Sequence, residues 1–169
     1  DCVGAPHPHA ENAPREGPRR VRAEARFLLV GVPEPAAAAS GEEEPMPVGD
    51  HCTRRVATAR PGATIRELAV QMDGEGTGCV VIVDSTHRPI GIVTDRDIAM
   101  RVLRRRRNAD ATVARDVMTE HPIRVREQTP VPTALRRMHG EGVRRVPVVG
   151  EGGKLVGIVS IDEGLRAIA

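Results

Sequence analysis

One segment of this chain has residue types suited to binding a nucleotide. Residues 91–98 read Gly-Ile-Val-Thr-Asp-Arg-Asp-Ile, so an apolar run leads directly into Thr94 and Asp97. A strand that runs into a helix start offers free backbone N–H groups and a partial positive charge, which suit a phosphate. The Thr94 hydroxyl and the Asp97 carboxylate add polar groups, and a carboxylate can accept hydrogen bonds from both hydroxyls of a ribose. The segment is therefore a candidate nucleotide site.

The same spacing also has a purely structural explanation. Thr94 followed three residues later by an acidic side chain is what a helix N-cap needs, and Ser160 with Glu163 matches a capping box still better. From spacing alone, the cap is favoured over a binding role. Two further observations favour a binding role over a cap alone. The chain is duplicated, and the duplicated pattern resembles a known family.

The chain contains one structural unit twice. Shifting the sequence by 66 positions aligns its second third with its last third without a gap; the matches include Asp50 with Asp116, Gly74-Glu75-Gly76 with Gly140-Glu141-Gly142, and Gly91-Ile92-Val93 with Gly157-Ile158-Val159. A unit of about sixty residues is too small to bury its apolar face alone. The two copies are therefore expected to pack on each other.

The chain divides into a tail and two repeats. Residues 1–45 are rich in Pro, Ala and Glu, a composition that does not easily build a packed core, so we expect a largely disordered tail. Within the tail, residues 26–32 could dock as an added strand or a short helix. The first repeat is expected over residues 46–111 and the second over residues 112–169.

Each repeat shows the same order of signals: strand, helix, strand, strand, helix. In the first repeat we expect a strand at 55–60, a helix that begins at Thr64 and ends at Gly74 or Gly76, strands at 79–83 and 90–93, and a helix from Thr94. In the second repeat we expect a strand at 122–126, a helix over 131–138 ending at Gly140, strands at 146–149 and 155–159, and a helix from Ser160. The predicted fold class is α/β (α+β).

Composition narrows the classes of function. The chain has one Phe and no Trp or Tyr, so it lacks the aromatic platforms on which single-stranded nucleic acids stack. A net charge of +2 gives no overall basic field for DNA or an anionic membrane. No apolar stretch approaches the roughly 20 residues of a membrane helix, and the start of the chain has no signal-peptide pattern. The missing initiator Met indicates a trimmed or partial chain.

The remaining reactive residue types show no catalytic or metal-binding pattern. The three cysteines lack the spacing of a zinc site or a disulfide framework, which fits a reducing compartment and makes the cytoplasm the expected location. The six histidines are scattered, and no nucleophile has a paired base. We therefore expect neither an enzyme nor a metal protein.

Two arginine clusters have competing explanations. The run of arginines at 104–107 could contact nucleic-acid phosphates, but cations at a helix C-terminus also complement the helix dipole, so nucleic-acid binding is not expected. Arg144 and Arg145 lie just before a predicted core strand, where they could face nucleotide phosphates or pair with surface glutamates.

The duplicated pattern resembles the CBS (cystathionine β-synthase type) domain family, as a tandem pair, or Bateman module, from residue 46 to the C-terminus. The resemblance rests on residues 91–98, on Asp116-Val117-Met118-Thr119, on residues 142–149 and on Gly157-Ile158-Val159-Ser160. It implies two β-α-β-β-α repeats packed sheet to sheet about a pseudo-twofold axis. It also implies two clefts that take adenine nucleotides or S-adenosylmethionine, and a homodimer.

The resemblance also implies which residues line each cleft. In the first cleft, Asp97 is expected to hold ribose and Thr94 to meet ribose or phosphate, with the base framed by Ala57, Thr58, Cys79, Val80 and Val81. The second cleft is expected to contain Thr119, Ile123, Arg145, Val146, Pro147, Ser160 and Glu163, and Arg144 is a further ligand-binding candidate at a cleft edge. Because Glu163 stands where the family has an Asp, the Asp97 cleft is expected to bind better.

The sequence thus predicts a regulatory module that senses AMP, ADP, ATP or S-adenosylmethionine and needs no cofactor. An effector protein would respond to the occupied module. The alternatives are a structural or protein-interaction module whose clefts are degenerate and empty, and an accessory module of an enzyme whose catalytic domain lies on another chain.

Overall fold

The computed structural model describes residues 46–168, which contain both repeats. The expected tail and its apolar segment at 26–32 lie outside the described residues. The fold is mixed α/β, with a four-stranded sheet in the order β1-β2-β3-β4 and a three-stranded sheet in the order β5-β6-β7.

The first repeat begins with α1 (Val48–His51) and contributes three strands to the four-stranded sheet: β1 (Thr58–Ala59), β2 (Cys79–Val83) and β3 (Pro89–Thr94). Helix α2 (Ile65–Glu75) connects β1 to β2, which pair in parallel. After β3, the short helix α3 (Asp95–Asp97) continues into the π-helix η1 (Ile98–Leu103). The strand expected at 55–60 is thus only two residues long.

The second repeat follows the same order. Its elements are η2 (Ala114–Asp116), β4 (Thr119–Glu120), β5 (Val125–Arg126), α4 (Val131–Glu141), β6 (Arg145–Val149), η3 (Glu151–Gly153), β7 (Leu155–Ser160) and α5 (Ile161–Ala167). β5 pairs in parallel with β6, and β6 pairs antiparallel with β7. Each expected buried strand of both repeats is present.

Local sequence signals explain where the long helices begin and end. Thr64 caps α2: the Glu67 N–H donates to the Thr64 hydroxyl (3.2 Å), and the Glu67 carboxylate accepts from the Thr64 N–H (2.7 Å). These hydrogen bonds lower the pKa of Glu67. Helix α2 ends at Gly76, which adopts a left-handed conformation with φ of 61° that only glycine takes without strain. Gly74, which was also expected to end the helix, lies inside it.

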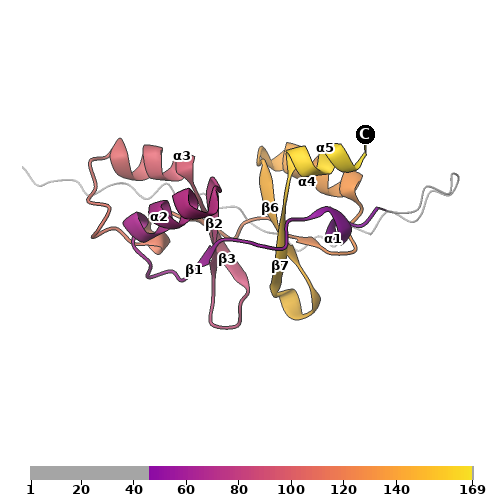
Figure 1. Ribbon diagram of the computed structural model, residues 1–169, viewed down its shortest axis with the longest axis horizontal. Coiled ribbons are helices and arrows are strands. Elements are labelled where there is room, and N and C mark those ends of the chain that lie inside the picture. Colours follow the sequence, from indigo (N-terminus) through magenta and orange to yellow (C-terminus); the bar gives the residue numbers. More distant parts are fainter. Residues whose placement is uncertain (1–45, 169) are drawn as a thin grey trace, which may run out of the picture. The chain divides into compact units, whose positions relative to one another are not determined.

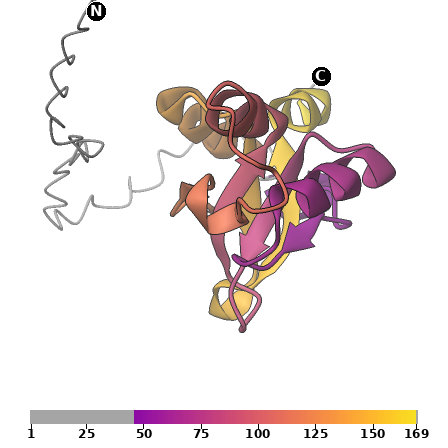
Figure 2. The ribbon, with the colours of Figure 1, turned by 90° about the vertical axis from the view of Figure 1, so that its left-hand side faces the viewer.

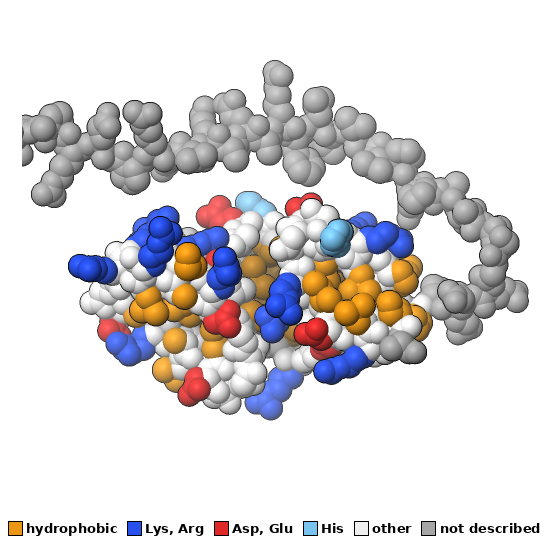
Figure 3. Space-filling model, turned by 90° about the horizontal axis from the view of Figure 1, so that it is seen from above, with side chains coloured by type: hydrophobic (Ala, Val, Ile, Leu, Met, Phe, Trp, Pro, Cys, Tyr) orange, Lys and Arg blue, Asp and Glu red, His pale blue; other side chains and the backbone are white. Residues whose placement is uncertain are grey.

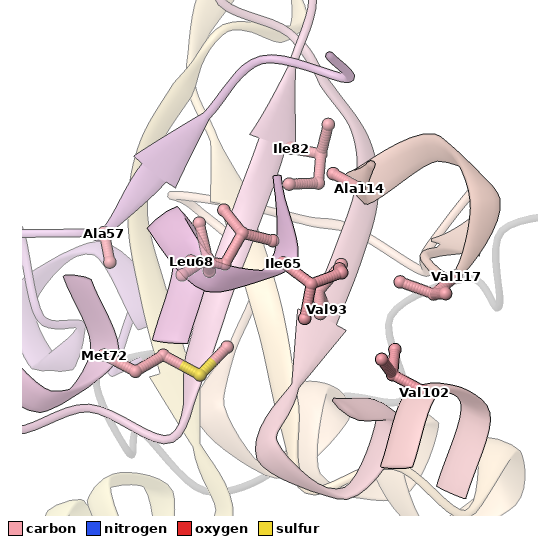
Figure 4. Close-up of a cluster of buried hydrophobic side chains, with 10 residues drawn as sticks. Ala57, Ile65, Leu68, Met72, Ile82, Val93, Val102, Ala114 and Val117 are labelled. Atoms are coloured by element: carbon pink, nitrogen blue, oxygen red, sulfur yellow. The ribbon is translucent and has the colours of Figure 1, made fainter. Parts of the chain in front are cut away.

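Each sheet has its own aliphatic core, and each core also takes in residues of the other repeat, Ala114 and Val117 in the first core and Val48 in the second. Figure 4 shows the first core, where Ile65 and Leu68 of α2 point towards Ile82 and Val93 of the sheet. Leu68 and Val93 are fully buried. The second core gathers Val48, Val125, Val131, Ala134, Met138, Val146, Val148 and Val159. Packing of an apolar helix face on a sheet therefore stabilises each half of the module.

The two sheets face each other, and the helices lie on their outer sides (Figure 1). A third buried cluster joins the sheets, with Val81 and Val83 of β2 against Leu155 and Ile158 of β7. Figure 2, viewed from the side of the first repeat, shows its helices in front of the strands and the β2–β3 hairpin beside the hairpin of the second repeat. Sheet-to-sheet packing of two repeats, as predicted, is confirmed.

The lead segments of the two repeats, residues 53–57 and 119–123, cross to the opposite sheet. β4 of the second repeat pairs with β3 of the first, with Thr119 opposite Ile92. Thr53 of the first repeat forms the matching bridge to Ile158 in β7, with hydrogen bonds of 2.9 and 3.0 Å in the two directions. This exchange decides which residues meet at the end of each sheet.

Candidate functional site

The candidate site lies where β7 runs into α5. Ser160 ends the strand and caps the helix, because the Glu163 N–H donates to the Ser160 hydroxyl (3.2 Å). In return, one carboxylate oxygen of Glu163, Oε2, accepts from the Ser160 N–H and from its hydroxyl, both at 2.7 Å. The other oxygen, Oε1, accepts a hydrogen bond from the hydroxyl of Thr53 in the first repeat. The expected capping box is thus confirmed.

A cavity of about 500 Å³ opens at this junction, and we call it the Glu163 cleft. The first repeat supplies one wall with Thr53, Arg55, Val56, Ala57, Cys79 and the Gly74-Glu75-Gly76 turn, and the second repeat supplies the other wall with Arg145, Ile158, Ser160, Asp162, Glu163 and Arg166. Its volume falls within the usual range for small-molecule sites. A ligand in it would touch both repeats.

The structure groups the predicted residues differently from the sequence-based expectation. Ala57 and Cys79, expected beside Asp97, lie in the Glu163 cleft. Thr119, expected beside Glu163, lies instead near Asp97, where its hydroxyl accepts from Arg101 at 3.3 Å. The physical reason is that the lead segments cross. Each lead segment pairs with the sheet of the other repeat, so each helix start lies next to residues of the other repeat.

Several predicted residues serve the cores instead of this cavity. The side chains of Val80, Val81 and Val146 are almost wholly buried within the sheets, and Pro147 is buried beside Val146. Ile123 packs on the second core, and the Thr58 carbonyl accepts from Gln71 of α2. Arg144 is exposed and its carbonyl accepts from the Ile161 N–H, while Arg145 reaches the cleft.

Sequence reasoning missed several cleft residues. Thr53, Arg55 and Arg166 were not assigned a role, yet all three line the Glu163 cleft. Two signals were available: Thr53 matches the predicted Thr119 at the offset of 66, and of the matched Gly74-Glu75-Gly76 and Gly140-Glu141-Gly142 turns the first forms part of the wall. Arg55 and Arg166 carry no repeat signal, since their counterparts are His121 and Met100.

The charges of the cleft are mixed. Three arginines, Arg55, Arg145 and Arg166, line it together with three carboxylates, Glu75, Asp162 and Glu163. Such a lining suits a ligand that carries both hydrogen-bond donors and anionic groups. On the face shown in Figure 3, Lys and Arg side chains likewise lie among Asp and Glu and do not form a single basic surface.

Cys79 is the one thiol of the cleft. Burial raises the pKa of this thiol, and the Thr77 hydroxyl and the charge of Arg145 oppose the shift only in part. The side chain is 4% exposed, so it stays a protonated thiol at neutral pH. Cys79 therefore acts as a small apolar wall residue and not as a nucleophile.

At the equivalent place in the first repeat, β3 runs into α3. Thr94 caps this helix, and Asp97 Oδ2 accepts from the Thr94 N–H at 2.9 Å and from its hydroxyl at 2.7 Å. The other oxygen of Asp97, Oδ1, lies 3.3 Å from Nε of Arg101. We call Thr94, Asp97, Arg101 and Thr119 the Asp97 junction.

Within residues 46–168 no group of three or more His, Cys, Asp or Glu is placed to hold a metal ion. Over the same part of the chain, no helix combines the length and the apolar character needed to cross a membrane.

The fold agrees with comparisons to known proteins. A model of the CBS domain matches twice, at residues 48–104 and 114–169. The chain belongs to the CBS domain family. Among its relatives, protein MK0525 of Methanopyrus kandleri is 40% identical over 119 residues, which are 70% of this chain and 61% of that protein. The chain thus spans less than two thirds of the length of that relative.

Solved CBS structures share the arrangement of the two repeats. The CBS domain protein PAE2072 of Pyrobaculum aerophilum, complexed with AMP, is 30% identical with a TM-score of 0.64, over 69% of this chain and 88% of that one. The CBS domain pair of MJ0100, in complex with 5′-methylthioadenosine and S-adenosyl-L-methionine, is 26% identical with a TM-score of 0.65, over 72% and 94%. Both of these CBS proteins hold adenosine compounds.

Proposed function

We propose that this CBS pair is a regulatory module that binds an adenosine-containing ligand, AMP, ADP, ATP or S-adenosylmethionine, in the Glu163 cleft. The observation that carries the proposal is the position of Glu163: its carboxylate lies at a helix start inside a cavity built by both repeats. The adenosine compounds held by two solved CBS relatives support the ligand class.

Each part of such a ligand has a matching group in the cleft. Glu163 Oε1 is held by the Thr53 hydroxyl, a neutral group that a ribose hydroxyl can replace. The arginines offer charged donors to phosphates or to the carboxylate of S-adenosylmethionine. Val56, Ala57 and Ile158 provide aliphatic contact for the base, since no aromatic side chain lines this cavity.

Regulation follows from the composition of the walls. A ligand that touches Thr53 and Arg55 of one repeat and Ser160 and Glu163 of the other can favour one packing of the repeats over another. It does so only to the extent that it binds the two arrangements with different affinity. No bond is made or broken in this role, and an effector protein, or a second copy in a homodimer, would respond to the change.

A structural module with an empty cleft is the second candidate, and the capping boxes favour it. Glu163 and Asp97 already have a complete role as helix caps, because each satisfies the backbone N–H of Ser160 or Thr94. Under this candidate, replacing Glu163 weakens the helix and nothing else.

Thermal unfolding of the full chain with a reporter dye tests the proposal, because the chain has no Trp. At a hundred times its dissociation constant, a ligand among AMP, ADP, ATP and S-adenosylmethionine should add about 2.7 kcal/mol, a shift of several degrees. Glu163→Ala should weaken binding about 10- to 100-fold, because a charged hydrogen-bond partner is lost. Absence of any shift in a cooperatively folded protein would leave the structural module as the function.

The matched control is Glu67→Ala. Glu67 occupies the same position in the capping box of α2 but does not line the cleft. Each substitution should cost about 1 kcal/mol of stability through the lost cap. Only Glu163→Ala should alter ligand affinity, so equal affinities in the two variants would identify Glu163 as a cap alone.

A further inference from the structure

Arg101 of the π-helix η1 lies between the two repeats. Its guanidinium faces Asp97 Oδ1 at 3.3 Å, donates to the Val117 carbonyl, and donates to the Thr119 hydroxyl at 3.3 Å. Asp97 belongs to the first repeat and the other two acceptors belong to the second. The guanidinium is therefore fixed at several points, and it bridges α3 to the lead segment of the second repeat.

This arrangement uses both carboxylate oxygens of Asp97. Oδ2 serves the Thr94 cap, and Oδ1 faces the cation. The Asp97 side chain is 15% exposed, against 39% for Arg101, so the carboxylate is largely shielded from water while the cation beside it stays in contact with solvent. A ribose that approached Asp97 would have to displace a charged partner before it could hydrogen-bond to Oδ1.

The Glu163 cleft has no such cation at the equivalent place. Residue 167, which follows Arg101 by the repeat offset of 66 positions, is Ala. The second oxygen of Glu163 has a neutral partner, the Thr53 hydroxyl. The two carboxylates therefore have the same role as caps but differ in how readily a ribose can reach them.

The helix that carries Arg101 also differs between the repeats. In η1 the Arg104 N–H donates to the Ala99 carbonyl, five residues back, at 2.9 Å, whereas α5 in the second repeat is an ordinary α-helix. Single π-turns recur at functional sites in proteins. Arg101 belongs to this wider helix, and from it the Arg101 side chain reaches both Asp97 and Thr119 of β4.

From these contacts we infer that Arg101 acts as an internal block: it occupies the ribose-binding carboxylate of the Asp97 junction, so that each chain binds one adenosine ligand, in the Glu163 cleft. The inference rests on the proposed function for the identity of that ligand. It reverses the sequence-based expectation that the Asp97 side binds better. Arg101 is the residue that sets the stoichiometry of binding.

Stoichiometry measured by isothermal titration calorimetry tests the block. The full chain and its variants are titrated with AMP and, separately, with S-adenosylmethionine as probes. Arg101→Ala and Arg101→Met should each raise the stoichiometry from one to two per chain, with the new site at least about tenfold tighter than in the wild type. Arg101→Met keeps an aliphatic stem over the junction and guards against a folding defect in the Ala variant.

The double variant Arg101→Ala/Asp97→Ala should return to one site per chain, because the exposed carboxylate is then gone. Arg104→Ala is the matched control, since Arg104 is an exposed arginine just after the same helix. That variant should behave as the wild type.

The outcomes separate this inference from the proposed function. One possible result is that the wild type binds no ligand, that Arg101→Ala binds one, and that the double variant again binds none. This result would support the block and would overturn ligand binding in the Glu163 cleft. Two sites in the wild type, an unchanged stoichiometry in both Arg101 variants, or weaker binding in them would overturn the block. No binding by any variant would overturn both.

Discussion

At the strand-to-helix junction the first repeat carries Thr94, Asp97 and Arg101, and the second carries Ser160, Glu163 and Ala167. Each helix start has a capping box, although a π-helix follows it only in the first repeat. Asp97 lies 3.3 Å from the Arg101 guanidinium, whereas Glu163 lines a cavity between the repeats and its second oxygen has the Thr53 hydroxyl as its partner. The comparison teaches that the elements and caps of a duplicated fold can persist while the two sites diverge through side chains one turn away.

The cores of the two repeats also differ in their side chains, although the elements that form them correspond. Leu68 of α2 is fully buried, and the matching residue of α4 is Ala134, which is 2% exposed. In the second repeat Leu135 packs beside the core instead and is only half-buried. The first core is therefore filled at this position by one large side chain, Leu68, whereas the second core has the small Ala134 with Leu135 packed beside it.

The largest effect is expected for Leu68→Ala. It should lower the free energy of unfolding by about 2–5 kcal/mol, because it leaves a cavity in the core of the first repeat. Chemical denaturation of the full chain measures the change. Val70→Ala on the same helix is the control; Val70 is 67% exposed, so its loss should stay within about 0.5 kcal/mol. Equal costs for the two variants would contradict the assigned core.

A smaller effect should distinguish the glycines at which the lead segments cross. A methyl group on Gly157 would lie 2.5 Å from Cys52 Sγ and 3.1 Å from the Thr53 carbonyl oxygen, whereas one on Gly91 would meet the flexible Met118 side chain. Gly157→Ala should therefore cost about 1–3 kcal/mol and Gly91→Ala less, as overpacking against backbone is harder to relieve. Denaturant midpoints of the two variants decide this, and the reverse order would show that the Thr53 bridge is not rigid.

The smallest effect concerns acid. Asp84, at the turn between β2 and β3, accepts from the Arg88 N–H (2.9 Å) and from Thr86, and these hydrogen bonds lower its pKa from the ordinary value of an aspartate. A carboxyl with a lowered pKa contributes stability above its unfolded pKa of about 3.9, and that stability is lost as the pH falls through the folded value. The matching residue of the second repeat is Gly150, so this acid dependence belongs to the first repeat.

Asp84→Asn removes the titrating group and keeps an acceptor. The melting temperature of the variant should lie below that of the wild type at neutral pH, and the gap should narrow as the pH falls below about 4. Thermal unfolding at a series of pH values measures the gap. A gap that stays constant with pH would mean that the charge of Asp84 contributes nothing.

Much of the fold was predictable because its signals are local. The Thr64 and Glu67 pair marked the start of α2, and the apolar run at 79–83 matched β2 residue for residue. Some local predictions were inaccurate: the strands expected at 55–60 and 122–126 shrank to two residues each, Thr58–Ala59 and Val125–Arg126, and helices α2 and α4 continued through Gly74 and Gly140. Tertiary packing decides both, because β1 exists only where it meets β2, and a buried apolar helix face outweighs the propensity of one glycine.

The candidate site was only half predictable. The repeat and its family resemblance predicted five residues of the cleft, Ser160, Glu163, Ala57, Cys79 and Arg145. They did not predict that these five residues line one cavity. Thr53 reaches Glu163 across 110 residues of sequence. Such a contact leaves no periodicity, cap or turn in either segment from which it could be predicted.

The sequence by itself determined the duplication, the order of elements, the caps at Thr94 and Ser160 and the CBS family, because each of these is written in neighbouring residues or in the fixed offset of 66. Only the tertiary structure decided that the lead segments cross, that Cys79 and Glu163 line the same cavity, and that Arg101 lies beside Asp97. The physical reason is that these contacts depend on how two sheets pack, and side chains far apart in sequence meet only once that packing is complete.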